Sequence, residues 1–179
     1  MTSIRPDRKR AVGLKTKLLF RAYRWLMKRE SMPMMTLRRW VVNSMTGGQS
    51  KVLNIFPNVF IEGFEGLVIG ESVSINRDCN ISAAGGLVIG NFVGIGHRCS
   101  IMSGEHDFRD GDQPMQGQGV RHARVVLNDN VLIGANSTIL AGISIASGCF
   151  VAAGSLVTKS FNEPDKVIGG IPARVIGSR

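Results

Sequence analysis

The chain has 179 residues, enough for one domain with a modest appendage. It contains 22 glycines and only 6% aromatic residues, which favours a slender fold with tight corners over a wide globular core. No apolar run approaches the roughly 18 residues that a membrane-spanning helix needs. The start of the chain shows no signal-peptide pattern, so we expect a cytoplasmic protein.

The net charge of +9 is unevenly distributed along the chain. Residues 1–51 contain 13 Lys and Arg against two acidic residues, a local excess of +11. The other 128 residues contain 9 basic and 11 acidic side chains, a balance of −2. The basic character therefore belongs to the N-terminal segment. No recognised nucleic-acid-binding motif accompanies this charge, so nucleic acid is not the expected partner.

Residues 1–50 are expected to form a basic, partly helical segment. Between Leu14 and Met27 the apolar residues share one broad helical face: Leu14, Leu18, Leu19, Ala22, Trp25 and Leu26. Two interpretations stay open. The helix packs this face on the protein or on another subunit, or it lies on an anionic membrane, which Trp25 and Tyr23 beside the cations would favour. Residues 30–50 are expected to be irregular, with Pro33 and Gly47-Gly48 marking a linker.

Residues 51–162 carry aliphatic residues at every sixth position. The most regular stretch has Leu127, Ile133, Ile139, Ile145, Val151 and Val157. Helices and exposed strands have other periods, whereas six residues make one strand plus one turn, and three such units close a coil of a parallel β-helix. The pentapeptide Gly-Leu-Val-Ile-Gly occurs at Gly66 and again at Gly86, a shift of 20 that fits three hexapeptides plus a two-residue bulge. The sequence therefore predicts an all-β, parallel β-helix.

The three cysteines share one position of the repeat. Cys79, Cys99 and Cys149 each follow a ladder residue by four places, a position that valine, isoleucine and serine occupy in the other repeats. We therefore expect small buried thiols without catalytic function. The sequence shows neither a disulfide framework nor a metal-ligand spacing, so no metal is expected.

The ladder breaks after Ile101 and resumes at Val125. The inserted loop, residues 103–124, contains two of the three histidines, His106 and His122. Loops of this length in compact domains are usually functional or disordered, so we expect the chemistry to lie here. His97 lies within a coil and is expected to point outward. In the tail, residues 163–179, a bend at Gly170 and Pro172 is expected to return the chain along the coils.

The motifs Val157-Thr158-Lys159 and Gly170-x-Pro-Ala-Arg174 resemble those of the left-handed β-helix acyltransferases, and the resemblance covers roughly residues 54–177. The run His-Asp-Phe-Arg-Asp at 106–110 is most similar to bacterial O-acetyltransferases of capsule, colanic-acid and lipopolysaccharide synthesis. The resemblance implies a left-handed parallel β-helix and a homotrimer. It also implies transfer of an acetyl group from acetyl-CoA to a hydroxyl of a sugar or glycan.

The resemblance also implies the roles of individual residues. It makes His106 the general base and gives an acceptor contact to Asn76; Asp107 and His122 of the loop are further candidates for substrate binding. The acetyl-CoA groove would be formed by Ala135, Ala153, Thr158, Lys159 and Arg174. One departure is Gly177, where related proteins often carry a second basic residue; Arg179 is a candidate replacement.

Histidine suits the proposed chemistry because a hydroxyl that attacks a thioester needs a base that is neutral near pH 7. Glu105, Asp107 or Asp110 could hold the imidazole in the required tautomer, and the sequence does not decide among them.

Three other functions remain open. The acceptor could be an amine, which would make the protein a sugar N-acetyltransferase. A zinc lyase of the carbonic-anhydrase type uses the same rod, but the three histidines lack the close paired spacing of such a site. The protein could also be a non-catalytic scaffold, which would bind neither metal nor coenzyme A.

Overall fold

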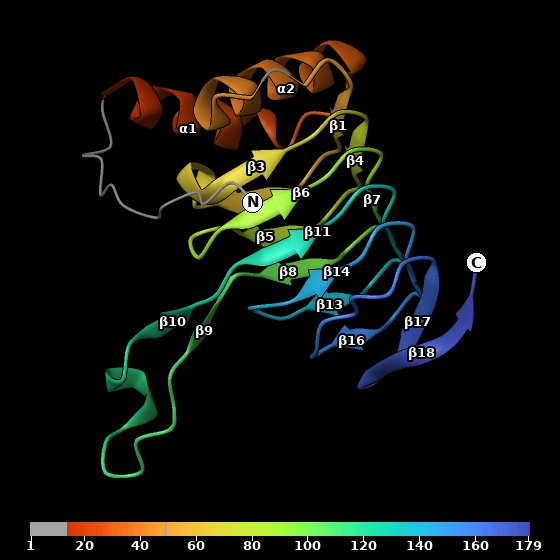
Figure 1. Cartoon of the computed structure of the whole chain (residues 1–179). Coiled ribbons are helices and arrows are strands. Elements are labelled where there is room, and N and C mark those ends of the chain that lie inside the picture. Colours follow the sequence, from red (N-terminus) through yellow and green to blue (C-terminus); the bar gives the residue numbers. More distant parts are fainter. Residues whose placement is uncertain (1–13, 49) are drawn as a thin grey trace.

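The computed structural model describes residues 14–48 and 50–179 as a rod of stacked β-coils with two helices over one end (Figure 1). A hairpin projects from the side of the rod, and the C-terminal strands close its other end. The predicted all-β fold is confirmed, and the architecture is consistent with a left-handed β-helix. The basic start of the chain, residues 1–13, lies outside the described residues.

Three parallel sheets run along the rod, and each coil contributes one strand to each sheet. Sheet A contains β1 (Leu53–Ile55), β4 (Val73–Ile75), β7 (Gly94–Ile95), β12 (Leu132–Ile133) and β15 (Phe150–Val151). Sheet B contains β2 (Phe60–Glu62), β5 (Asn80–Ser82), β8 (Ser100–Met102), β13 (Thr138–Ile139) and β16 (Leu156–Val157). Sheet C contains β3 (Leu67–Ile69), β6 (Leu87–Ile89), β11 (Val125–Leu127) and β14 (Ser144–Ile145).

We name each corner of the rod by the two sheets that its turns connect. The AB corner comprises residues 56–59, 76–79, 96–99, 134–137 and 152–155. The BC corner comprises residues 63–66, 83–86, 103–124, 140–143 and 158–160. The CA corner comprises residues 70–72, 90–92, 128–130 and 146–149.

The aliphatic ladder forms the interior of the rod. Ile75, Ile95 and Ile133 stack in register on adjacent coils and are fully buried. Leu67 pairs with Leu87, which confirms the predicted shift of 20 between coils. The cysteines are buried as predicted. Their thiols donate to backbone carbonyls, as Cys79 Sγ does to the Gly96 oxygen at 3.0 Å.

The AB corner repeats the same left-handed turn from coil to coil. Its left-handed residues are Asn58, Asp78, Arg98 and Asn136, with φ of 58°, 61°, 54° and 59°, and Gly154, with φ of 73°. Asn and Asp tolerate this conformation better than most residues, which explains their frequency here. Backbone hydrogen bonds join successive turns, for example from Asn136 N–H to the His97 oxygen at 2.8 Å.

Two helices precede the rod, α1 (Leu14–Leu26) and α2 (Met32–Thr46). The expectation that residues 30–50 are irregular is therefore wrong. Pro33 lies in the first turn of α2, where a missing N–H costs nothing, and Gly47 ends the helix with φ of 70°. The two residues that we took for linker signals are the start and stop signals of a helix.

The helices pack on the first coil through a few buried side chains. The Tyr23 hydroxyl donates to the Val59 oxygen at 2.8 Å, and its ring meets the Phe64 ring edge-on, with centroids 5.3 Å apart. Arg38 of α2 is fully buried and donates to the carbonyl oxygens of Leu26, Arg29 and Ile55 at 2.9, 2.7 and 2.8 Å. It therefore ties the end of α1 to the rod.

This packing buries only part of the apolar face predicted for residues 14–27. Tyr23 and Leu26 are buried, whereas Leu18 and Trp25 face outward. Tyr23 is thus unable to contact a membrane. Within residues 14–48 and 50–179, no helix is long and apolar enough to span a bilayer.

At the far end, β17 (Lys166–Gly170) continues sheet A beside β15, and β18 (Ala173–Ser178) returns antiparallel to it. This confirms the predicted bend of the tail. Two short 3₁₀ helices complete the elements, η1 (Phe64–Gly66) and η2 (Met115–Gly117).

Candidate functional site

The inserted loop leaves the BC corner as a β-hairpin, not as an irregular excursion. Its strands are β9 (Gly104–His106) and β10 (Val120–His122), with η2 near the tip (Figure 1). His106 lies opposite Val120, and His122 lies opposite Gly104. Residues 104 and 106 share one face of the hairpin, and residues directly opposite each other share a face as well. Both loop histidines therefore lie on the same face as diagonal neighbours, roughly 7–8 Å apart.

The three acidic residues considered as orienting partners of His106 are engaged elsewhere. Glu105 forms an ion pair with Arg121 across the hairpin. Arg109 binds the Asp107 carboxylate through Nε at 2.8 Å and through Nη2, and this guanidinium holds the pKa of Asp107 well below its usual range. Asp110 accepts hydrogen bonds at 2.7 Å from the Gln113 side chain and at 3.0 Å from the Asp112 N–H.

The His106 side chain is exposed, and no residue in the described part of the chain forms a hydrogen bond with its imidazole. A substrate could therefore reach this ring.

The predicted acetyl-contacting residues lie together at the AB corner. Ala135 and Ala153 occupy equivalent turns of adjacent coils, joined by a hydrogen bond from Gly154 N–H to the Ala135 oxygen at 2.8 Å. Asn76 and His97 occupy the same corner in the two preceding coils, and His97 faces outward as expected. The Asn76 amide donates to the Ile95 oxygen at 3.0 Å, so part of its hydrogen-bonding capacity joins coils.

The predicted nucleotide-binding residues lie at both ends of β16. Thr158 and Lys159 are exposed at the BC corner, and Lys159 Nζ lies 5.7 Å from the centroid of the Phe161 ring. Arg174 is also exposed and pairs with Gly169 on β17, next to the Ala153 turn. Arg179 follows the opposite end of β18 and donates its N–H to the Asp165 oxygen at 2.8 Å. Arg179 therefore does not occupy the position of a second basic residue beside Arg174.

The predicted site residues thus form two groups on two corners of one rod. His106 and His122 extend from the BC corner. Lys159 lies on the same corner two coils further along, which corresponds to roughly 10 Å along the rod axis at the spacing of paired strands. Asn76, Ala135 and other members of the second group line the AB corner, and sheet B separates the two corners. A single chain does not bring the loop histidines to the AB corner.

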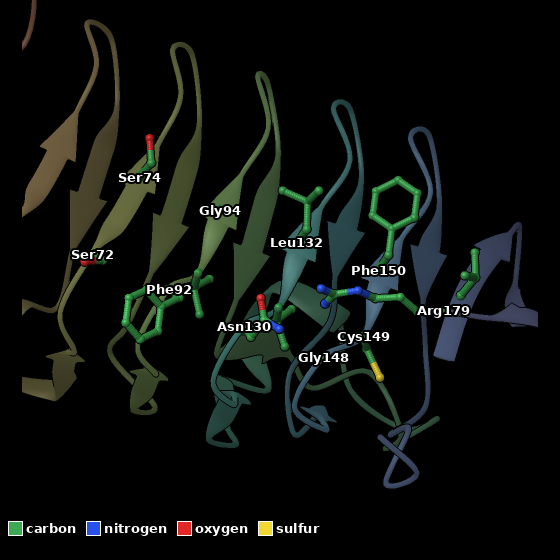
Figure 2. Close-up of a pocket in the computed structure, with 13 residues that line it drawn as sticks. Ser72, Ser74, Phe92, Gly94, Asn130, Leu132, Gly148, Cys149, Phe150 and Arg179 are labelled. Carbon is green, nitrogen blue, oxygen red and sulfur yellow. The ribbon is translucent and has the colours of Figure 1, made fainter. Parts of the chain in front are cut away.

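A groove of about 590 Å³ crosses the outer face of sheet A (Figure 2). Apolar side chains such as Phe92, Leu132 and Phe150 line it, and Arg179 lines it as well. The groove contains neither loop histidine and none of the residues predicted to contact acetyl-CoA. We therefore do not assign the catalytic step to this groove, in spite of its size.

The described part of the chain shows no cluster that resembles a metal centre. Among residues 14–48 and 50–179, no three or more His, Cys, Asp or Glu side chains are grouped so that they could hold an ion. His97 lies on the AB corner, away from the hairpin that carries His106 and His122.

The sequence analysis missed the ion pairs that brace the hairpin, Glu105–Arg121 and Asp107–Arg109. The first is a cross-strand pair that could be predicted only once the register of β9 and β10 was known. The second links residues two positions apart, and the acidic-basic spacing was visible in the sequence as a possible signal.

Comparison with known proteins supports the repeat and the fold. Residues 124–159 match the family model described as the hexapeptide repeat of succinyl-transferase. A search of curated proteins gave no significant match.

Several solved structures have the same fold. A hexapeptide-repeat acetyltransferase from Vibrio cholerae O1 biovar eltor, in complex with acetyl coenzyme A, superimposes with a TM-score of 0.80 at 23% identity, covering 96% of this chain and 93% of that one. A maltose O-acetyltransferase from Clostridium difficile 630 gives 0.76 at 24% identity, covering 90% and 84%. A mutant N-acyltransferase from Bacillus cereus, in complex with dTDP-4-amino-4,6-dideoxyglucose and coenzyme A, gives 0.57 at 25%, covering 73% and 82%. The chain therefore has the β-solenoid fold of the hexapeptide-repeat acetyltransferases.

Proposed function

We propose that this protein is a cytoplasmic acetyltransferase that moves an acetyl group from acetyl-CoA to a hydroxyl of a sugar or glycan. The observation that carries the proposal is the exposed histidine pair on a hairpin that interrupts an otherwise regular rod. A repeat protein does not need such an insertion for stability, because each coil is held by its neighbours. The fold and the acetyl-CoA complex of a protein of similar structure supply the reaction class.

In this reaction His106 is the general base. It accepts the proton of the acceptor hydroxyl as the hydroxyl oxygen attacks the thioester carbonyl. A carbon–oxygen bond forms, the carbon–sulfur bond breaks, and the imidazolium returns its proton to the leaving thiolate. A base of this kind contributes typically 10²–10⁴-fold to the rate. His122, on the same face of the hairpin, would contact the acceptor beside it.

The residues that would hold acetyl-CoA are compatible with its shape and charge. Ala135 and Ala153 offer small side chains and turn backbone to the thioester arm, and Ala153 is exposed. Ala153 would contact the thioester arm and Lys159 the phosphates. These two residues are at most about 20 Å apart, which is the fully extended length of the chain between them. Lys159 and Arg174 are exposed cations without a carboxylate partner within the described residues, so both are free to bind phosphate groups.

The active site would be shared between copies in a homotrimer. The support is the division of the site, with the histidines on the BC corner and the acetyl-contacting turns on the AB corner of the same rod. A closed ring of three parallel rods would place one chain's hairpin against the next chain's AB corner and leave no interface unsatisfied.

The shared site can be tested by mixing two inactive variants, His106→Ala and Ala153→Trp. Ala153 is exposed, so the indole should block the groove without disturbing the coil. In randomly mixed trimers, about a quarter of the sites would have an intact hairpin and an intact corner, so activity should return to about a quarter of wild type. No recovery in mixed trimers would show that each site belongs to one chain.

The proposed reaction itself is tested by coenzyme A release from acetyl-CoA over a panel of sugars and lipid-linked glycans. Treatment of the isolated products with mild base then distinguishes O- from N-acetylation, because it cleaves esters and leaves amides intact. The similarity to an N-acyltransferase keeps the amine acceptor as the second candidate. A protein that binds no coenzyme A and turns over no acceptor would be a scaffold.

A further inference from the structure

The outer surface of the two-helix cap takes no part in the proposed acetyl transfer. On α1 the exposed side chains form one stripe: Lys17, Leu18, Arg21, Arg24 and Trp25. Their spacing places them on a single face, opposite Tyr23 and Leu26. Leu18 is 56% exposed and Trp25 is 59% exposed. The packing that buries Tyr23 and Leu26 thus leaves Leu18 and Trp25 outside among cations, a pattern typical of helices that lie in a membrane interface.

A hollow of about 520 Å³ lies beside this stripe. It is lined by Arg24, Trp25, Met27, Lys28, Arg29 and Phe60, and the Arg29 guanidinium lies 4.5 Å from the Trp25 ring centroid. Three cations and two aromatic rings surround it, and no carboxylate lines it. Guanidinium and ammonium groups in this arrangement suit a phosphate group.

The charge of the two helices is not balanced by acids within the helices themselves. Residues 14–48 contain eight Lys and Arg and a single acidic residue, Glu30. Glu30 is engaged by Arg77 of the rod at 3.0 Å, and within the described residues Lys17, Arg21 and Arg24 form no ion pair. An anionic surface is therefore the complementary partner.

The second helix adds apolar surface to the same cap. Trp40 of α2 is 59% exposed, and Met32 and Leu37 of the same helix are exposed as well. Trp25 and Trp40 are the two tryptophans of the chain, so both lie exposed on the cap. Tryptophan at a membrane interface places its ring at the level of the head groups.

We propose that the cap surface, formed by the α1 stripe, the adjoining hollow and the exposed side chains of α2, binds an anionic phospholipid bilayer. Lipid phosphates would occupy the hollow, and Leu18 and Trp25 would enter the interface. The inference does not depend on acetyl transfer. If the rods form the proposed parallel trimer, three such surfaces face the same way, which strengthens binding by avidity. A membrane-bound trimer would suit a lipid-linked acceptor; both the trimer and this acceptor rest on the proposed function.

The test uses the full chain with phosphatidylcholine vesicles and with vesicles of phosphatidylcholine and phosphatidylglycerol in equal parts, without acetyl-CoA or acceptor. We expect co-sedimentation with the anionic vesicles only, weakening as salt is raised. In a Trp40→Phe variant, the emission of Trp25 should shift to shorter wavelength on binding. An unshifted emission with bound vesicles would show that Trp25 does not enter the interface and would overturn the proposed surface.

Two charge reversals give a matched comparison. Each basic residue near an anionic surface is worth roughly fivefold in the partition coefficient, so Arg21→Glu with Arg24→Glu should lower it at least about 25-fold. Arg124→Glu with Arg179→Glu changes the net charge equally but lies outside the cap and should alter it less than threefold. Equal losses in the two variants would indicate non-specific attraction, and absence of binding by the wild type would refute the proposal. Circular dichroism of each variant verifies folding, and retained coenzyme A release separates loss of lipid binding from failure of the enzyme.

Discussion

The AB and BC corners of the rod are built from the same repeat but differ in what they do. At the AB corner, successive coils make the same left-handed turn and stack by backbone hydrogen bonds. At the BC corner, one coil opens into the β9–β10 hairpin, whose side chains are exposed and held by ion pairs. Regularity at one corner supplies a rigid scaffold, and the interruption at the other carries His106 and His122 away from the rod.

The difference follows from how coils are packed. At the AB corner, backbone hydrogen bonds join each turn to its neighbours, and a Cβ on Gly96 or Gly134 would meet backbone atoms of the next coil. The hairpin has no coil above it, and a Cβ on Gly111 or Gly117 would meet nothing within 4 Å. The four predictions below test this contrast, beginning with the largest expected effect.

The first prediction concerns the base on the hairpin. His106→Ala should lower kcat by about 10²–10⁴ while the dissociation constant of coenzyme A changes less than about threefold, because a general base acts in the transition state. His122→Ala, on the same face of the hairpin, should lower kcat by about tenfold or less. Coenzyme A release and direct binding of coenzyme A measure both variants. Equal kcat in His106→Ala and wild type would remove this histidine from the mechanism.

The second prediction concerns backbone packing at the AB corner. A Cβ on Gly134 would lie 2.4 Å from the Ala153 nitrogen and 2.7 Å from the Val151 oxygen. These are backbone atoms of the next coil, which cannot turn aside, so Gly134→Ala should reduce the free energy of unfolding by about 3 kcal/mol. Chemical denaturation followed by circular dichroism measures the change.

Gly117→Ala is the matched control for that substitution. A Cβ at Gly117, near the tip of the hairpin, would meet nothing within 4 Å. The free energy of unfolding should change by less than about 0.5 kcal/mol. If the two substitutions lowered the free energy of unfolding equally, the hairpin would be as closely packed as the coils, and the proposed difference between the two corners would be wrong.

The same contrast explains which features the sequence could predict. The rod follows from a period of six, because burial of Ile133 or Ile95 depends only on the neighbouring coils, and the structure confirms it. The hairpin strands were not predicted, since each has three residues and no clear alternation of polar and apolar side chains. Helix α2 was missed because the largest side chain that it buries is Arg38, which a pattern of apolar residues does not reveal. The proposed site roles remain predictions.

The third prediction separates the two arginines of the tail. Arg174 lies beside the Ala153 turn, whereas Arg179 lies in the groove on sheet A. A charged hydrogen bond to phosphate is worth about 1.5–3 kcal/mol. Arg174→Ala should therefore weaken coenzyme A binding at least tenfold, and Arg179→Ala should have little effect. Isothermal titration calorimetry decides between them. Weaker binding in Arg179→Ala than in Arg174→Ala would reverse the assignment of these residues.

The fourth and smallest effect is expected at Arg98, which adopts the left-handed conformation of the AB corner with φ of 54°. Arginine pays about 1–2 kcal/mol for this conformation, whereas glycine adopts it without strain but loses more entropy on folding. The two terms nearly cancel, so Arg98→Gly should change the free energy of unfolding by less than about 1 kcal/mol. Asn136→Gly, at the equivalent turn of the next coil, should change it even less, because asparagine tolerates the left-handed region better than arginine. A loss above 2 kcal/mol in Arg98→Gly, by the same denaturation measurement, would mean that the arginine side chain itself stabilises the corner.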